Sequence, residues 1–255
     1  MFWQDKTVMI TGASSGIGRG LALELSRRGA KVGLVARRAP ALAELVREIE
    51  NANGKAISLP ADVMEAESLH SAADRLRGTF GPIDALSANA GVGVTVDGAE
   101  LKGSTVADVL NVNVLGAANS VEAVVPEMVR RGSGQLVVIS SLAAYRGLPK
   151  SAAYCASKAA VSAFFESLRL DLQPRGIDVT IIHPGFIKTP LTEGRHAQMP
   201  FLMELDDAVI KIVSAIEKRK KSYAFPWQLA SIVRAGMVMP NFMYDWISRR
   251  NSFRE

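Results

Sequence analysis

Cysteine and histidine are scarce in this chain of 255 residues, which contains one cysteine and three histidines. The single thiol, Cys155, excludes an intramolecular disulfide and a zinc site made of cysteines, and it suits a reducing compartment. The histidines at positions 70, 183 and 196 show no metal-ligand spacing, and His183 fits the buried end of a strand. We therefore expect a cytoplasmic protein that binds no metal.

A long uncharged hydrophobic run is also missing. The most apolar late stretch, residues 226–247, contains Arg234, Pro240 and Asp245, whereas a helix that spans a bilayer needs about 20 nearly uncharged residues. Residues 1–5 are too short for a signal peptide, because a strand pattern already begins at Thr7. The sequence therefore predicts neither a membrane-spanning helix nor a secretory leader.

Positive charge is in slight excess but is not concentrated on one predicted face. The net charge is +5, and most lysines and arginines are spread along the predicted helices. Their one cluster, residues 218–221, fits a solvated helix end, where cations suit the helix dipole, and an anionic surface partner is the alternative. Because a nucleic-acid surface needs basic residues gathered on one face, we expect no nucleic-acid partner.

Short β-rich runs alternate with longer amphipathic stretches along the chain. The expected strands are residues 7–11, 31–36, 56–59, 85–88, 134–139, 179–183 and 223–225, and the expected helices are residues 18–28, 41–52, 65–78, 104–131, 152–174 and 206–218. Near-continuous apolar runs such as residues 136–139 are typical of parallel strands buried on both faces. The pattern shows no internal repeat and no linker. It predicts a single α/β domain over residues 1–255, a Rossmann-type, doubly wound, seven-stranded parallel sheet with helices on both faces.

A glycine-rich turn follows the first predicted strand at residues 11–18, with the sequence Thr-Gly-Ala-Ser-Ser-Gly-Ile-Gly. A turn of this kind between a strand and a helix lets backbone N–H groups and the helix N-terminus bind a pyrophosphate. Gly12 allows the tight turn, Gly16 the close approach of the ligand and Gly18 the packing of helix on strand. We therefore predict a dinucleotide site whose residues include Gly12, Ser14, Ser15, Gly16, Ile17 and Gly18.

The end of the second predicted strand bears on which dinucleotide is bound. An NAD enzyme needs a carboxylate about 20 residues past the glycines, where it accepts a hydrogen bond from the ribose 2′-hydroxyl. This chain has Ala36 there, followed by Arg37 and Arg38, and an arginine can form a bidentate contact with a 2′-phosphate. We expect NADP(H) to be preferred over NAD(H), with Arg37 as the first choice for this contact and Arg38 as the second. A solvated pair at a helix start is the alternative.

Tyr154 and Lys158 lie four residues apart on the predicted helix at residues 152–174, so they share one face. An unperturbed tyrosine has a pKa near 10 and is a poor base at neutral pH, and a fixed cation nearby favours its phenolate. Tyr145 has Pro149 four residues further on, so no cation lies one turn away and we assign it no chemistry. The pattern predicts that Tyr154 is a general acid and base assisted by Lys158.

Two further polar positions are candidates for the same site. Ser140 and Ser141 end the fifth predicted strand, where a hydroxyl can hydrogen-bond a substrate oxygen, although a strand-end cap is the alternative. Asn113 lies inside the predicted helix at residues 104–131, and asparagine is a poor residue for a helix interior. Its presence there indicates a kink or a bound water.

The Gly-x-x-x-Gly-x-Gly spacing at residues 12–18 and the Tyr-x-x-x-Lys pair at residues 154–158 resemble the short-chain dehydrogenase/reductase family, in its short single-domain branch. The resemblance covers residue 6 to about residue 190. It implies that Ser141 rather than Ser140 orients the substrate oxygen. It also implies that Asn113, in its Asn-x-x-Gly pattern, supports a proton relay through water to Lys158.

The same resemblance implies further contacts to the cofactor and an assembly. Residues expected to bind the cofactor, besides the glycine-rich turn, Tyr154 and Lys158, are Asp62 and Val63 at the adenine, Asn89, Ala90 and Gly91 after the fourth strand, and Pro184, Gly185, Ile187 and Thr189 at the nicotinamide. The resemblance also implies a homodimer or homotetramer built through the helices at residues 104–131 and 152–174.

Two late segments have no counterpart in these motifs. Residues 190–206, which include Gly194, His196 and Phe201, have no clear period and are expected to form a lid over an apolar substrate, with a pinned surface loop as the alternative. The C-terminal extension at residues 226–255 mixes aromatic residues and methionines with arginines. A cover over the substrate or a subunit contact is favoured for it, and peripheral membrane contact is the less favoured alternative.

These patterns together predict an NADP(H)-dependent oxidoreductase that transfers a hydride between nicotinamide and a carbonyl or secondary alcohol, with an apolar small-molecule substrate. Asn113, Ser141, Tyr154 and Lys158 are the expected catalytic residues. The alternative from another class is a non-catalytic NADP(H)-binding sensor or scaffold on the same fold. An epimerase or dehydratase is a third possibility, but such relatives have a different glycine spacing and a larger C-terminal domain than this chain.

Overall fold

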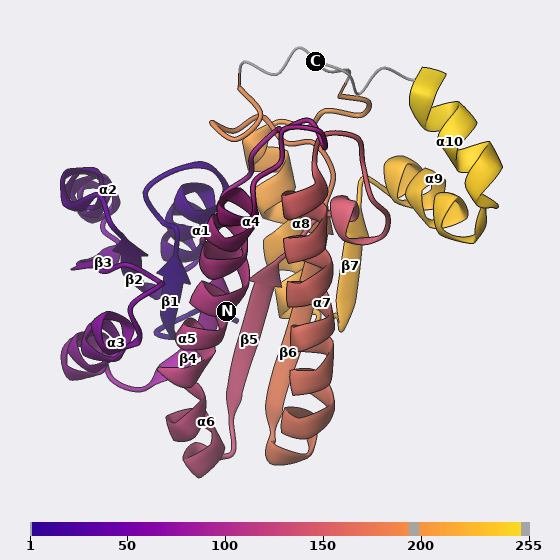
Figure 1. Ribbon diagram of the computed structural model, residues 1–255. Helices are drawn as coiled ribbons and strands as arrows, with labels where there is room; N and C mark the ends of the chain where they lie inside the picture. The colour runs from indigo at the N-terminus through magenta and orange to yellow at the C-terminus, as the bar shows by residue number, and fades with distance from the viewer. Residues whose placement is uncertain (1, 194–198, 251–255) are drawn as a thin grey trace.

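A single parallel sheet forms the centre of the computed structural model, which describes residues 2–193 and 199–250 (Figure 1). Within that part of the chain its strands are β1 (Thr7–Thr11), β2 (Lys31–Ala36), β3 (Lys55–Pro60), β4 (Ile83–Ala88), β5 (Gly134–Ile139), β6 (Ile177–Pro184) and β7 (Ser222–Phe225). Their order across the sheet is β3-β2-β1-β4-β5-β6-β7, and each neighbouring pair is parallel. The predicted doubly wound, seven-stranded fold is confirmed, with strand ends that move by one or two residues.

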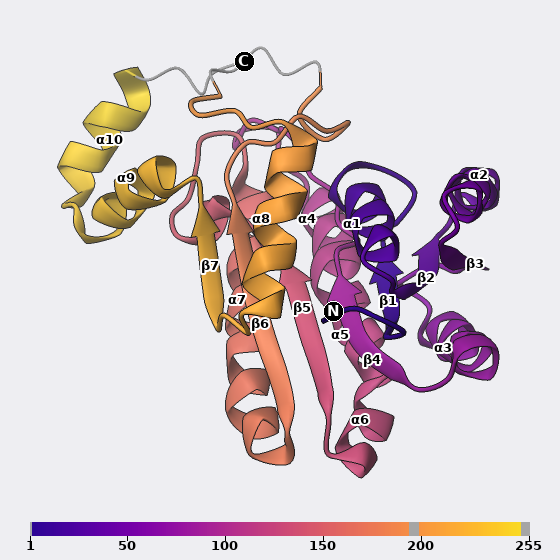
Figure 2. The same ribbon diagram turned by 180° about the vertical axis from the view of Figure 1, so that it is seen from behind.

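Helices cover both faces of the sheet. One face carries α1 (Gly16–Arg27), α2 (Ala39–Asn51) and α8 (Leu205–Glu217), and the other carries α3 (Ala66–Phe80), α4 (Gly103–Leu110), α5 (Gly116–Glu122), α6 (Val125–Arg131) and α7 (Ala152–Leu172) (Figures 1 and 2). Each face has its own apolar core. Leu21, Leu45 and Ile212 are fully buried on the first, and Leu69 and Phe165 on the second. This burial on both faces explains the continuous apolar character of the strands.

The prediction of a single long helix over residues 104–131 is wrong. α4 begins at Gly103 with Lys102 as its N-cap, and a π-helical turn, Asn111–Leu115, separates it from α5. The side chain of Asn113 bonds outside the helix, to Val92, which stabilises the irregular turn. α6 is separate because Pro126 lacks the N–H group that would continue α5.

The C-terminal extension is helical, which its mixed composition did not predict. α9 (Trp227–Val238) and α10 (Asn241–Arg250) form a pair beside β7, at the end of the sheet where the strands terminate (Figures 1 and 2). Residues 251–255, also assigned to this extension, lie outside the described residues. Among the described helices, none is long and apolar enough to cross a membrane.

The carboxyl ends of the strands are the natural place for a ligand in this topology. β1 lies between β2 and β4, so the chain leaves β1 toward one edge of the sheet and later returns to its other side. The loops that follow β1 and β4 therefore diverge and leave a crevice between them. The glycine-rich turn follows β1 and Asn89 follows β4 at this point.

Candidate active site

A cavity of about 820 Å³ opens along the carboxyl ends of the strands. Its lining includes most of the residues predicted for the site: Gly12, Ser14, Ser15, Gly16, Ile17, Arg37, Arg38, Asp62, Val63, Asn89, Ala90, Gly91, Ser141, Tyr154, Lys158, Pro184, Gly185, Ile187 and Thr189. Gly18 and Asn113 are the predicted residues that are not part of the lining. The fold thus brings motifs that are far apart in the sequence to one continuous surface.

The glycine-rich turn is tied to the segment after β4. Gly12 has a φ of +67°, and a Cβ atom there would lie 2.8 Å from Cα of Ala90. The side-chain amide of Asn89 donates to the carbonyl oxygens of Thr11 (3.0 Å) and Gly12 (3.3 Å). A Cβ atom at Gly18 would meet the Gly12 oxygen at 2.4 Å, so Gly18 permits close packing of helix on turn without facing the cavity. These contacts hold the turn in the conformation that a close ligand needs.

The start of α1 is suited to an anion such as a pyrophosphate. Its N-cap residue, Ser15, makes no side-chain capping hydrogen bond, and the first turn contains no acidic residue. The first N–H groups of the helix are therefore not paired with a capping side chain, and the positive end of the helix dipole is not offset by a carboxylate. Since Ser15, Gly16 and Ile17 line the cavity, the residues present fit the phosphates of a dinucleotide.

Two arginines lie at the end of the cavity next to β2. Arg38 donates from Nη2 to Oγ of Ser14 at 3.0 Å, which places its guanidinium beside the glycine-rich turn. Arg37 has a side chain that is 67% exposed, and its Nη1 atom lies 3.8 Å from Oδ2 of Asp62. Within residues 2–193 and 199–250 neither forms a tight ion pair, so both guanidinium groups are accessible to a ligand. β2 itself ends at Ala36, which offers no carboxylate to a ribose 2′-hydroxyl.

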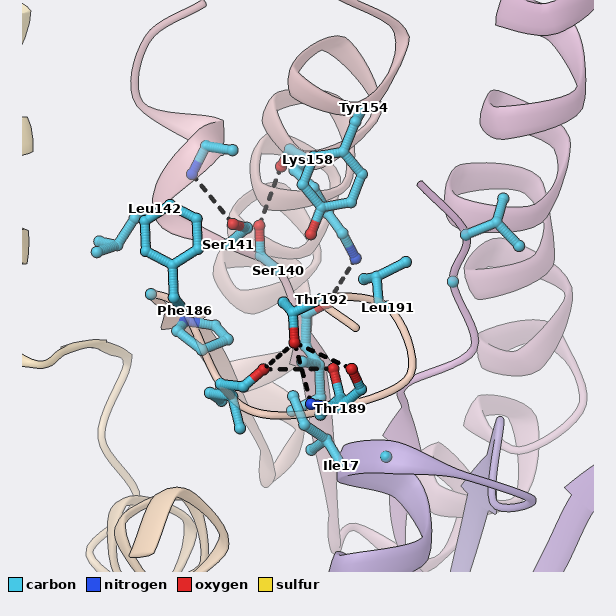
Figure 3. A pocket seen from close by; sticks show the side chains of 18 of the residues that line it. Ile17, Ser140, Ser141, Leu142, Tyr154, Lys158, Phe186, Thr189, Leu191 and Thr192 are labelled. Carbon is cyan, nitrogen blue, oxygen red and sulfur yellow. Dashed lines mark hydrogen bonds between the residues drawn. The ribbon is translucent and has the colours of Figure 1, made fainter. Parts of the chain in front are cut away.

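Tyr154 and Lys158 extend from the first turns of α7 toward the same part of the cavity (Figure 3). The Nζ atom of Lys158 lies 5.7 Å from the centre of the Tyr154 ring and donates to the carbonyl oxygen of Ile139 at 2.9 Å. Lys158 is 6% exposed, and burial lowers the pKa of its ammonium to about 8. A Cβ atom at Gly91 would lie 3.4 Å from Nζ, so this glycine leaves room for the ammonium.

The two serines at the end of β5 have different surroundings. The hydroxyl of Ser140 is buried and bonds to the carbonyl oxygen of Lys158 (3.1 Å) and to Oγ of Ser162 (2.7 Å). Oγ of Ser141 accepts from the N–H group of Ala143 at 3.1 Å, which leaves its own proton available to the cavity. Ser140 braces α7 against the strand, whereas Ser141 is placed to contact a ligand.

Asn113 braces the site from behind the cavity. Its Oδ1 atom accepts from the N–H group of Val92 at 2.7 Å, and its Nδ2 atom donates to the Val92 oxygen and to Oγ of Ser157, both at 2.9 Å. The side chain is 98% buried and joins the segment after β4 to α7. Its side-chain hydrogen-bonding groups are therefore engaged with Val92 and Ser157, the residues next to Gly91 and Lys158 in the chain.

The segment after β6 lies opposite Tyr154 across the cavity. The N–H group of Gly185 donates to the oxygen of Phe225 at 2.8 Å, which fixes the start of the segment. Thr192, which the sequence motifs did not single out, donates to the oxygens of Ile187 (2.7 Å) and Thr189 (3.0 Å) and closes a tight turn (Figure 3). Nδ1 of His183 lies 3.3 Å from the oxygen of Ser141, and burial lowers the pKa of its ring, which fits the predicted buried position.

The remaining wall of the cavity is mostly apolar and comes largely from segments without a motif. Its side chains are Leu142, Leu148, Phe186, Leu191, Leu229, Ile232, Val233, Met239, Tyr244 and Ile247, together with Arg146. Of the expected lid at residues 190–206, residues 190–192 and Pro200 line the cavity, and residues 194–198, with Gly194 and His196, lie outside the described residues. The helical spacing of the apolar residues in α9 was the signal that could have identified this wall from sequence.

The sequence profile of the short chain dehydrogenase family matches residues 6–200. The chain belongs to this family. The match covers the glycine-rich turn, the segments after β4 and β6, and the pair Tyr154 and Lys158, and it stops before α8. This family member is therefore an oxidoreductase of the carbonyl and alcohol class, for which a nicotinamide cofactor is typical.

Individual relatives extend over nearly the whole chain. An uncharacterized oxidoreductase of Myxococcus xanthus is 44% identical over 96% of this chain and 97% of its own length. The ketoacyl reductase HetN of a Nostoc species is 32% identical over 82% of this chain and 75% of its own. A short chain dehydrogenase/reductase from Burkholderia phymatum, solved in complex with NAD, is 26% identical and superposes with a TM-score of 0.85 over 92% of this chain and 93% of its own. The match with the Myxococcus relative is long enough to include at least part of the C-terminal extension.

Proposed function

We propose that this enzyme is an NADP(H)-dependent oxidoreductase that interconverts a bulky, mainly apolar carbonyl compound and its secondary alcohol, with Tyr154 as general acid and base. The observation that carries the proposal is the placement of Tyr154, Lys158 and Ser141 on one cavity that continues to the glycine-rich turn and the two arginines. The cavity's other wall is apolar, which supports the substrate class.

The bound nicotinamide supplies or accepts the hydride, and the residues of this chain handle the proton and the oxygen. Ser141 donates a hydrogen bond to the carbonyl oxygen, keeps its proton, and orients that oxygen toward Tyr154. Tyr154 transfers its proton to that oxygen as the alcohol forms. The ammonium of Lys158 stabilises the resulting phenolate, because it is held on the same helix face and is largely shielded from solvent. The reverse reaction uses the same groups in the opposite order.

The preference for NADP(H) rests on the end of β2. Arg37 and Arg38 line the cavity where the second strand stops, and Ala36 replaces the carboxylate that would accept from a 2′-hydroxyl. A 2′-phosphate there would gain charge-assisted hydrogen bonds from guanidinium groups that form no tight ion pair with the described part of the chain.

A homodimer or homotetramer through the α4–α6 segment and α7 also forms part of the proposal. Leu115, at the end of the π-helical turn, is 48% exposed, and Leu170, near the end of α7, is 62% exposed. Large apolar side chains on these two outward surfaces support a contact between copies of the chain.

The test of the proposed function is Tyr154→Phe, assayed by the oxidation of NADPH with a panel of ketones and aldehydes. We expect turnover to fall by about 10² to 10⁴, because the general acid is lost, while the Kd of NADPH stays within about twofold. Tyr145→Phe is the matched control, since Tyr145 packs on the His183 ring and is not part of the cavity lining. Turnover in Tyr154→Phe close to that of the control would refute the assignment, and a wild-type protein that binds NADPH but reduces nothing on the panel would favour the sensor or scaffold.

A further inference from the structure

Arg146 joins the loop after β5 to the C-terminal helix pair. Its Nη1 atom donates to the carbonyl oxygens of Gly236 and of Met239, the latter at 3.0 Å, and its Nη2 atom donates to Oδ1 of Asn241 at 2.9 Å. Gly236 lies in the last turn of α9, Met239 is its C-cap and Asn241 begins α10. One guanidinium therefore caps the C-terminal end of α9, where a cation also suits the helix dipole, and it contacts the side chain of Asn241 at the start of α10.

A second contact fixes the same junction. The guanidinium carbon of Arg146 lies 3.8 Å from the centre of the Tyr244 ring, and the Tyr244 hydroxyl donates to the carbonyl oxygen of Gly147 at 2.6 Å. Tyr244 is on α10, so both helices are tied to residues 146–147. Arg146, Gly236, Met239 and Tyr244 all line the cavity, which places this junction in the wall itself.

Apolar packing alone holds the helix pair only weakly. In α9 the buried residues are Leu229, Ala230 and Gly236, and the small cluster around them reaches Leu142 next to Ser141. Other large side chains of the pair face solvent, and Val238 and Phe242 are 85% and 75% exposed. With so little apolar surface buried, the hydrogen bonds of Arg146 carry a large share of the attachment.

The loop that carries Arg146 is the same one that begins at Ser141. Ser141 is the N-cap of the short 3-10 helix at Leu142–Ala144, and Arg146 follows two residues after that helix. The position of α9 and α10 is therefore set relative to the hydroxyl that faces the substrate oxygen. A substrate held at Ser141 would extend toward Ile232, Val233 and Ile247 in the wall that Arg146 holds in place.

We propose that Arg146 is a positioning residue that determines substrate selectivity, because it keeps α9 and α10 in place as the outer wall of the substrate pocket for long apolar carbonyl compounds. This inference rests on the proposed function for the class of substrate. Arg146 does not contact the reacting atoms. Its effect is on how much apolar surface a long substrate buries.

The test compares binding of 2-tridecanone and cyclohexanone to the NADP-loaded enzyme by calorimetry, so that it does not require turnover. In Arg146→Ala we expect the Kd of the long ketone to rise by about tenfold or more, since it loses contacts with the wall, while the Kd of cyclohexanone and of NADPH change by less than about twofold. Arg130→Ala, which removes an exposed arginine on α6, is the control for charge. Tyr244→Phe, which removes only the hydrogen bond to Gly147, should change the same Kd in the same direction by a smaller factor.

The position of the helices is measured separately. Trp227 and Trp246 lie on α9 and α10, and the third tryptophan of the chain, Trp3, is buried in the core. In Arg146→Ala we expect faster tryptic cleavage after the exposed Arg234. We also expect the emission of Trp227 and Trp246 to change while the emission of the buried Trp3 stays the same. The proposal would be overturned if α9 and α10 are released in Arg146→Ala but the ratio of the Kd values of the two ketones stays that of the wild type. Unchanged cleavage after Arg234 would overturn it as well. A wild-type enzyme that binds the long ketone but never reduces a carbonyl would overturn the proposed function instead.

Discussion

Arg37 and Arg38 differ in the contacts that they already make, and this difference determines how each would meet a 2′-phosphate. Arg38 is hydrogen-bonded to Ser14, which fixes it over the glycine-rich turn. The Arg37 side chain is 67% exposed and makes a long contact of 3.8 Å to Asp62. A 2′-phosphate would therefore find Arg38 in place and draw Arg37 from solvent, with the loss of little existing interaction.

Arg37→Ala is expected to weaken the binding of NADPH by about 10- to 100-fold and that of NADH by less than about twofold, because only NADPH has the 2′-phosphate that Arg37 would contact. The measurement is the Kd of each cofactor by titration of nucleotide fluorescence. Arg47→Ala is the matched control, since it removes an exposed arginine from α2, the helix that follows Arg37, without touching the cavity. An equal loss of affinity for both cofactors would show that Arg37 does not bind the 2′-phosphate.

At the scale of the secondary-structure element, the π-helical turn between α4 and α5 is explained by the site that it supports. An uninterrupted α-helix would carry the Asn113 side chain to a different angle, away from the segment that follows β4. In the observed turn Asn113 satisfies both backbone groups of Val92 and reaches Ser157 on α7. The irregular element therefore couples three parts of the fold near Lys158.

Asn113→Ala is expected to lower the free energy of unfolding by about 1–3 kcal/mol, because it leaves the Val92 N–H and C=O groups without this partner. The measurement is urea unfolding at neutral pH. Asn111→Ala is the control, since Asn111 is exposed and belongs to the same π-helical turn. We also expect lower turnover in Asn113→Ala alone, and equal stability of the two variants would contradict the bracing role.

At the scale of the whole molecule, Lys158 makes the stability of the fold depend on pH. Burial lowers the pKa of its ammonium to about 8 from the ordinary value of 10.5. Between these two values the unfolded chain binds a proton that the folded chain does not, so the free energy of unfolding rises with pH. Below pH 8 both states are charged and the full cost of burying the ammonium remains. The enzyme therefore keeps a charged group next to Tyr154 at the expense of stability at neutral pH.

Lys158→Met removes this dependence. As pH rises from about 8 to about 10.5, we expect the free energy of unfolding of the wild type to increase by about 3 kcal/mol relative to that of Lys158→Met. The measurement is a series of urea unfolding curves across that range. Lys211→Met, at an exposed position of α8, should give a flat difference. A flat difference for Lys158→Met as well would mean that its ammonium is not perturbed.

The alternation of apolar runs with amphipathic stretches was sufficient to predict the doubly wound sheet, because parallel strands covered on both faces must be apolar along their whole length. The glycine-rich turn and the pair at Tyr154 and Lys158 were equally visible, since each is contiguous or lies within one helical turn. The observed order of strands confirms the predicted sheet, and the family match covers both sequence motifs. The catalytic roles of these residues stay predictions.

Local sequence could not decide where separate segments meet. The break of the helix at residues 111–115 depends on Val92, which lies 21 residues earlier in the chain than Asn113. The junction of Arg146 with α9 and α10 joins residues more than 90 positions apart. Periodicity and motif spacing report the neighbours of a residue along the chain, whereas these contacts arise only when the sheet sets the positions of its loops. The sequence alone thus determined the fold class and the family of chemistry, and the tertiary structure decided which side chains brace the site and which helices form the apolar wall of the cavity.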